Sequence, residues 1–145
     1  MRKLVCLMVC IALIACEGPR IEMASSTSDA EGKAFPPPLP GKAALYIAAG
    51  YIPDVSTISV GRLEAGSLIR HTWLRVDVNP GNHEIRARSP YSESSLSLAL
   101  TAGTTTFAQL QYVDRRPWSD VLSQVSSGQG RELVLAGKRA AIPRS

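Results

Sequence analysis

The sequence predicts an all-β protein: a small antiparallel β-sandwich behind a cleaved N-terminal signal peptide and a Pro/Ser-rich tether. From residue 42 to about residue 113, apolar and polar residues alternate with a period of two, as in half-buried strands. Gly and Pro residues separate these runs and predict turns. The chain has 145 residues, of which 45% are hydrophobic and 19% charged, so it has room for one packed domain.

Residues 1–15 are predicted to be a signal peptide. Arg2 and Lys3 provide a short positive start, and the run Leu4–Ala15 carries no charge. Such a run is too short to cross a bilayer, which takes about 20 residues, but it is typical of a signal peptide. Removal of Arg2 and Lys3 lowers the formal net charge from +4 to +2. This charge is too small to predict nucleic acid as a partner.

The end of this run, Leu13–Cys16 (LIAC), resembles the bacterial lipobox. The resemblance implies cleavage before Cys16, a diacylglycerol on its thiol and acylation of its new amino group, so the membrane is a predicted partner. Asp after the cysteine often retains lipoproteins in the inner membrane; Glu17 stands there, which favours the outer membrane. Cys6 and Cys10 leave with the peptide, so the mature chain keeps no thiol for a disulfide. An ordinary signal peptide or a core helix with a chance cysteine is the alternative.

Residues 16–41 are predicted to be the lipidated Cys16 and a flexible tether. The segment starts with few apolar residues, includes the run Ser25–Ser28, and ends in the proline cluster Pro36–Pro40. We expect the prolines to form an extended polyproline II spacer that holds the domain tens of Å from the bilayer. A ligand for a proline-binding module is the alternative.

The domain is predicted to span residues 42–136. Its expected strands, in chain order, are Ala43–Ala49, Thr57–Leu63, Thr72–Val78, His83–Arg88, Ser95–Leu100 and Thr104–Val113. Asn79–Asn82 is predicted to be a turn with positive φ at Gly81, which closes a hairpin that pairs Val78 with His83. Residues 118–136 fit either a strand or a helix, with a turn at Gly128–Gly130. Residues 137–145 are predicted to be a basic C-terminal tail.

The predicted hairpin would also create a docking face. It brings four residues together on the side of the sheet that faces away from the core: Trp73, Arg75, Arg86 and Arg88. Trp and Arg are enriched at binding hot spots, and a guanidinium over an indole ring is favourable. Alternatively, the segment around Trp118 folds back over Trp73 and forms a second small core.

The turn and core residues carry a family resemblance. They are Gly61-x-Leu63, Gly66, Val76-x-Val78-x-Pro80-Gly81-x-His83 and Leu98-x-Leu100-x-Ala102-Gly103-x-x-x-Phe107. The pattern resembles a group of bacterial lipoproteins with a shared domain of unknown function, similar to PEGA-type and prealbumin-like modules. The resemblance implies a sandwich over residues 42–110 and assigns no catalytic residue.

No sequence motif signals catalysis, a metal site or a cofactor, so we expect no enzyme and no cofactor. His83 is expected to hydrogen-bond the neighbouring turn, and His71 to be solvated. The predicted function is a membrane-anchored envelope lipoprotein: a non-catalytic interaction module that faces the periplasm or the cell surface. Its possible partners are an envelope protein or a cell-wall polymer. The alternatives are a structural envelope component, or an accessory hydrolase whose site is not visible in the sequence.

Overall fold

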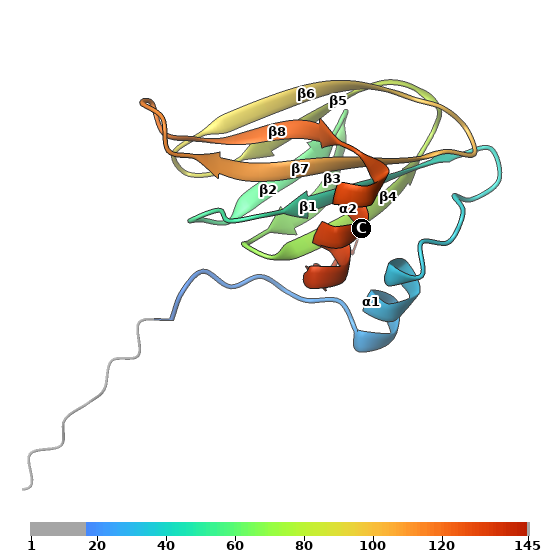
Figure 1. Ribbon diagram of the computed structural model, residues 1–145, viewed down its shortest axis with the longest axis horizontal. Helices are drawn as coiled ribbons and strands as arrows, with labels where there is room; N and C mark the ends of the chain where they lie inside the picture. Colours follow the sequence, from blue (N-terminus) through green and yellow to red (C-terminus); the bar gives the residue numbers. More distant parts are fainter. Residues whose placement is uncertain (1–16, 145) are drawn as a thin grey trace, which may run out of the picture.

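The computed structural model describes residues 17–144, in which nine strands and two helices occur. The strands are β1 (Ala43–Ala49), β2 (Ser56–Val60), β3 (Leu63–Leu68), β4 (Thr72–Val78), β5 (Gly81–Arg88), β6 (Glu93–Leu100), β7 (Thr105–Val113), β8 (Ser119–Val125) and β9 (Lys138–Arg139). The helices are α1 (Ser26–Lys33) and α2 (Ser127–Ala136). One sheet has the order β8-β7-β1-β4-β9 and the other has the order β3-β2-β5-β6 (Figure 1). The predicted all-β sandwich is therefore confirmed.

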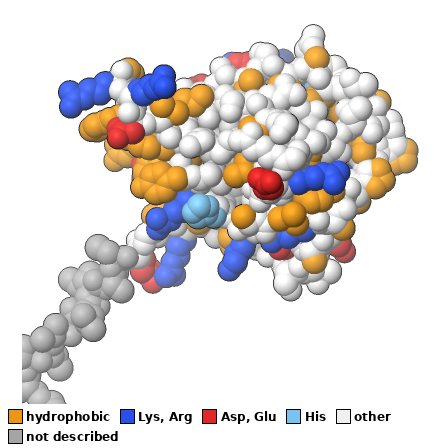
Figure 2. Space-filling model, viewed as in Figure 1, with side chains coloured by type: hydrophobic (Ala, Val, Ile, Leu, Met, Phe, Trp, Pro, Cys, Tyr) orange, Lys and Arg blue, Asp and Glu red, His pale blue; other side chains and the backbone are white. Residues whose placement is uncertain are grey.

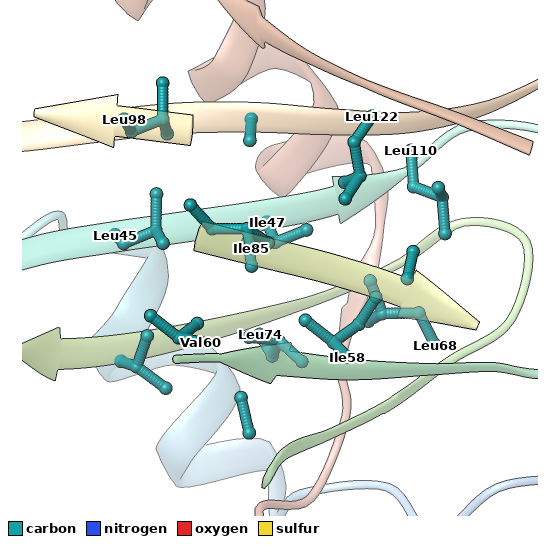
Figure 3. Packing of buried hydrophobic residues seen from close by; sticks show 14 of the residues in the cluster. Leu45, Ile47, Ile58, Val60, Leu68, Leu74, Ile85, Leu98, Leu110 and Leu122 are labelled. Carbon is teal, nitrogen blue, oxygen red and sulfur yellow. The ribbon is translucent and has the colours of Figure 1, made fainter. Parts of the chain in front are cut away.

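The main core lies between the two sheets. Alternate residues of β1, such as Leu45 and Ile47, point at Ile58 and Ile85 of the opposite sheet, and all four are fully buried (Figure 3). Leu98 of β6 is 6% exposed and belongs to the same cluster, as the alternation in this strand predicts. Burial of each such side chain contributes about 1.5–3 kcal/mol, so these aliphatic contacts hold the sheets together.

The five-stranded sheet is covered on its other side as well. Every residue of β1 is buried, because α1 and α2 lie against the face that points away from the four-stranded sheet (Figure 1). Tyr46, Trp73 and Phe107 project from this face and pack with Val134 of α2. Phe35, just after α1, completes the cluster with ring centroids 5.5 Å from Tyr46 and 6.0 Å from Phe107. The molecule thus has three layers, the third of which was not expected.

Two glycines let the helices approach the sheet closely. A Cβ at Gly32 of α1 would collide with the ring of Trp73, and one at Gly130 of α2 would collide with Phe107. The predicted turn at residues 128–130 is therefore wrong: these residues lie in the first turn of α2, which the Ser126 side chain caps by accepting a hydrogen bond from Gln129 N. Residues 118–136, which fitted strand or helix, contain both β8 and α2.

The predicted hairpin between β4 and β5 is wrong. β4 pairs with β1, where Val78 lies opposite Ala43, while β5 pairs with β2 and β6, where His83 lies opposite Leu98. Gly81 has φ +131°, in the positive region that was expected, but the turn passes from one sheet to the other. The burial patterns explain the difference, because β4 is buried on both faces whereas β5 alternates. β1 and β7 run parallel, so the sandwich is only partly antiparallel.

The segment expected to be a flexible tether packs on the domain instead. Ile21 contacts the main core, and Met23 forms an isolated antiparallel bridge with Ala140. Hydrogen bonds from Ala24 N to Arg139 O and from Ala141 N to Glu22 O, each 3.0 Å long, extend this contact. The N-terminal segment and the end of the chain thus hold each other, and α1 follows directly.

Candidate functional site

The predicted docking residues do not share a surface. Trp73 is fully buried and Arg75 is 9% exposed, both in β4 of the five-stranded sheet. Arg86 and Arg88 are exposed on β5 of the four-stranded sheet. Cys16, the predicted lipidation site, lies outside the described residues. The expected face depended on the β4–β5 hairpin, so it is lost with that pairing.

Trp73 belongs to the second core. It stacks obliquely on Tyr46, with ring centroids 5.7 Å apart, and the Arg139 guanidinium lies 5.3 Å from its ring centroid. The cation over the indole is therefore Arg139 and not Arg88. The alternative prediction is confirmed in one part: a second small core surrounds Trp73. Its covering segment was predicted wrongly, because the helices cover the ring while Trp118 is 59% exposed.

Arg75 fastens the proline segment to the sheet. Its guanidinium donates to Pro36 O (3.0 Å), to Pro37 O (3.2 Å) and to both carboxylate oxygens of Asp77 (2.8 and 3.3 Å). Asp77 in turn accepts from Leu39 N at 2.8 Å. Burial by itself would raise the pKa of Asp77, but the hydrogen bonds from Arg75 and Leu39 outweigh it and lower the pKa. These contacts are structural.

Arg86 and Arg88 form exposed ion pairs on the outer face of the four-stranded sheet. Arg86 Nη2 lies 3.0 Å from Glu84, and Arg88 Nε lies 3.1 Å from Glu93. Exposed pairs of this kind contribute little to stability, because water and salt screen their attraction. His83 behaves as expected, because its ring Nε2 donates to Asn79 O in the neighbouring turn at 2.6 Å.

Three loops meet at one end of the sandwich. β1 and β7 run parallel, with Ala49 opposite Leu110, so both strands end on the same side. β5 ends there too, because Arg88 pairs with Thr57 at the start of β2. The loops that follow these strands, residues 50–55, 89–92 and 114–118, lie at the left end of the view in Figure 1. At the upper left of Figure 2, where the β7–β8 loop projects, basic side chains stand at the tip with hydrophobic ones beneath.

The three loops enclose a hollow of about 380 Å³. Its lining residues are Pro53, Asp54, Ser89, Tyr91, Ser92, Tyr112, Trp118 and Asp120. Tyr91 is 82% exposed and Trp118 59% exposed, so both rings are open to a ligand. Large aromatic side chains with few rotatable bonds are enriched at recognition surfaces. This hollow, which we call the loop-end hollow, is therefore the candidate functional site.

Asp120 lies at the base of the loop-end hollow and is only 5% exposed. Ser56 Oγ donates to its carboxylate at 3.2 Å, and its backbone N–H donates to Ser92 Oγ at 3.2 Å. Burial raises the pKa of Asp120, and the negative charge of Asp54 raises it further, although the Ser56 hydroxyl opposes the change. The site thus contains two neighbouring carboxylates, one of them buried.

Hydrogen bonds hold the loops in place. Ser89 N donates to Ser92 O at 2.9 Å, and the two serine hydroxyls lie 3.1 Å apart. Tyr112 N donates to Tyr51 O at 2.9 Å, and their rings pack edge to face with centroids 6.3 Å apart. The hollow is therefore largely preformed, as binding sites commonly are.

Sequence reasoning did not identify this site. Its aromatic and acidic residues come from loops and strand ends that are far apart in the chain. The parallel β1–β7 pairing and the β2–β5 pairing bring these segments to one end. A weak signal existed, because Tyr91 and Trp118 directly follow Pro90 and Pro117, and proline is typical of turns, which run over the protein surface.

In residues 17–144, no helix has both the length and the apolar character needed to span a membrane. The same residues contain no cluster of three or more His, Cys, Asp or Glu side chains placed to hold a metal ion. No protein-family model and no curated protein matches the sequence.

Proposed function

We propose that the mature chain is a lipoprotein of the bacterial cell envelope, in which lipid on Cys16 provides the membrane anchor and the β-sandwich is a non-catalytic interaction module. The observation that carries the proposal is the order of features at the start of the sequence. A positive pair, Arg2 and Lys3, precedes an uncharged run that ends in Leu13–Cys16. Glu17 after the cysteine favours the outer membrane, and the resemblance to PEGA-type modules belongs to the same proposal.

The packing of the N-terminal segment supports an anchor that holds the domain close to the bilayer. Ile21 already contacts the core, and a fully extended chain from Cys16 to Ile21 spans no more than about 18 Å. Two or three acyl chains on one residue are enough for stable membrane binding. In this arrangement the module works next to the lipid surface, and the long spacer expected from the sequence is not needed.

The loop-end hollow supports a binding role for the module. It presents open aromatic rings on loops that two rigid sheets position, which is the usual way in which a sandwich carries a recognition site. Its partner would be an envelope protein or a cell-wall polymer, met in the periplasm or at the cell surface.

Metabolic labelling with radioactive palmitate tests the anchor. Wild type should incorporate label and sediment with membranes, whereas Cys16→Ser should do neither, because a hydroxyl is a much poorer nucleophile than a thiolate. Cys10→Ser, a matched cysteine substitution within the predicted signal peptide, should label like wild type. Equal labelling of the wild type and Cys16→Ser would refute the anchor.

The accessory hydrolase stays an alternative because of Asp54 and Asp120. A buried carboxyl group with a raised pKa beside a second carboxylate is a pattern used for general acid catalysis. Release of soluble fragments from cell-wall polymer by wild type, with none released by Asp120→Asn, would favour this alternative over a binding module.

A further inference from the structure

Three aspartates, Asp29, Asp77 and Asp120, are buried or half-buried, and they differ in how their charge is balanced. Asp29 has Lys33 Nζ at 2.8 Å, and Asp77 has Arg75 Nε at 2.8 Å. In both cases burial would raise the pKa, but the cation and further hydrogen bonds lower it. Asp120 is at least as deeply buried, yet within residues 17–144 it takes part in no ion pair. Burial of an unpaired carboxylate is costly, so its place at a surface hollow asks for an explanation.

The surroundings of Asp120 are suited to a cation from outside the chain. Asp54, half-buried in the β1–β2 loop, lines the same hollow and is in no ion pair among the described residues. Arg115 and Arg116 are on the same β7–β8 loop as Trp118, but neither of them lines the hollow. Two carboxylates therefore face one small space without a protein cation in it.

The remaining walls are aromatic. Tyr91, Tyr112 and Trp118 line the hollow together with Pro53. The face of an aromatic ring carries partial negative charge and attracts cations, most strongly when the cation is poorly hydrated. A small, strongly hydrated inorganic ion gains little from such walls, whereas a methylated ammonium group fits both the rings and the carboxylates.

From these observations we propose that the loop-end hollow binds an organic ammonium group, with a trimethylammonium group as the best fit. The inference rests on the proposed binding role of the module and names the chemistry of its ligand. Asp54 and Asp120 supply the counter-charge, and the rings of Tyr91 and Trp118 contact the methyl groups. Ser56 and Ser92 hold Asp120 in position, since one donates to its carboxylate and the other accepts from its backbone N–H.

Calorimetric titration of the full mature protein in maltoside detergent tests this proposal. The probe is choline chloride, and the reference is 3,3-dimethyl-1-butanol, which has the same shape without the charge. Ionic strength is kept constant with sodium chloride. Choline should bind at least tenfold more tightly than the neutral isostere. Equal affinity for both, or no binding of choline up to tens of millimolar, would overturn the proposal.

Three variants locate the site. Asp54→Asn and Trp118→Ala should each weaken choline binding about tenfold or more. The fold should tolerate both, because Asn has the size of Asp and Trp118 is exposed. Glu64→Gln removes the same charge as Asp54→Asn, but from an exposed position of β3 that does not line the hollow, so it should leave affinity within about twofold. Thermal unfolding of each variant checks that it is folded. If Asp54→Asn and Glu64→Gln behave alike, the ligand does not sit in this hollow.

This test is independent of the test of the lipid anchor. If the protein binds choline but does not incorporate palmitate, the proposed anchor is refuted and the proposed ligand site is supported. If it incorporates palmitate but does not bind choline, the anchor is supported and the ligand site is refuted.

Discussion

Arg75 is a charged residue that lies buried beside the second core, and its hydrogen bonds explain how it can do so. Its five guanidinium hydrogen bonds go to Asp77, to the carbonyl groups of Pro36 and Pro37, and to Tyr46 Oη, and the ring of Tyr46 lies beneath it. A planar guanidinium with several fixed donors is well suited to such a place. The residue that appeared to be a docking arginine thus closes the N-terminal segment onto the sheet.

Asp77→Asn should destabilise the protein at pH 7. The substitution removes the charge that compensates Arg75, and we expect the free energy of unfolding to fall by about 2 kcal/mol or more. Because the folded-state pKa of Asp77 lies below its ordinary value, this stabilisation is complete above that ordinary value and is lost as the pH falls through the folded-state pKa. Denaturant unfolding of wild type and variant at pH 7 and at pH 3 measures both effects, and the difference between the two proteins should be smaller at the lower pH.

Asp120→Asn is the matched control, because the pKa of Asp120 is shifted in the opposite direction to that of Asp77. The folded-state pKa of Asp120 is raised, so the stability of the fold falls as the pH rises from the ordinary value through the folded-state pKa, and the loss is complete above it. Asn has the same size and keeps an acceptor for Ser56. The variant should therefore be as stable as wild type at pH 7, or more stable. A loss as large as that of Asp77→Asn would show that Asp120 is a structural residue and not an unbalanced charge.

At the level of elements, the helices depend on glycines that a propensity argument would disfavour. Gly32 and Gly130 are buried where α1 and α2 meet the sheet, and a side chain at either position would enter an aromatic ring. Gly in a helix costs about 1 kcal/mol relative to Ala, so the close packing must compensate for this cost. The absence of a side chain at these two glycines leaves room for the rings of Trp73 and Phe107.

Gly32→Ala should therefore lower stability although alanine favours helices. The added methyl group collides with the ring of Trp73, and we expect a loss of about 1–3 kcal/mol, as in other overpacked sites. Gly128→Ala is the control, because a Cβ there meets nothing within 4 Å, and it should be neutral or stabilising by up to about 1 kcal/mol. Thermal unfolding compares the two. Equal midpoints would mean that α1 does not pack on Trp73 as described.

The strands that could be predicted from the sequence are those with one buried face and one solvent-exposed face. β5 and β6 alternate in burial, and their side-chain pattern shows this directly. β4 also alternates in sequence, so Trp73 and Arg75 were expected to be exposed. They are buried because the helices and the N-terminal segment cover that face of the strand. Helix α1 was missed, and α2 was left open between strand and helix with a turn predicted at its start. In both cases the first residues, Ser25–Ser28 and Gly128–Gly130, are turn-forming types that here cap or space a helix.

At the scale of the whole molecule, the two ends of the chain and the two sheets are joined at their edges. Residues 21–24 run alongside residues 139–141, and Ser94 Oγ of β6 accepts from Leu122 N of β8 across the edges of the two sheets. Single-sequence reasoning found the sandwich but not these joins, because strand order and loop clustering depend on pairings between distant segments. The loop-end hollow was missed for the same reason.

The central proposal is a lipid-anchored module, and the intact mass of the protein extracted from its own membranes tests it most directly. Mass spectrometry should show a chain that begins at Cys16 and carries a diacylglyceryl group and an amide-linked acyl chain. A chain that retains residues 1–15, or one that begins elsewhere and carries no lipid, would contradict the proposal.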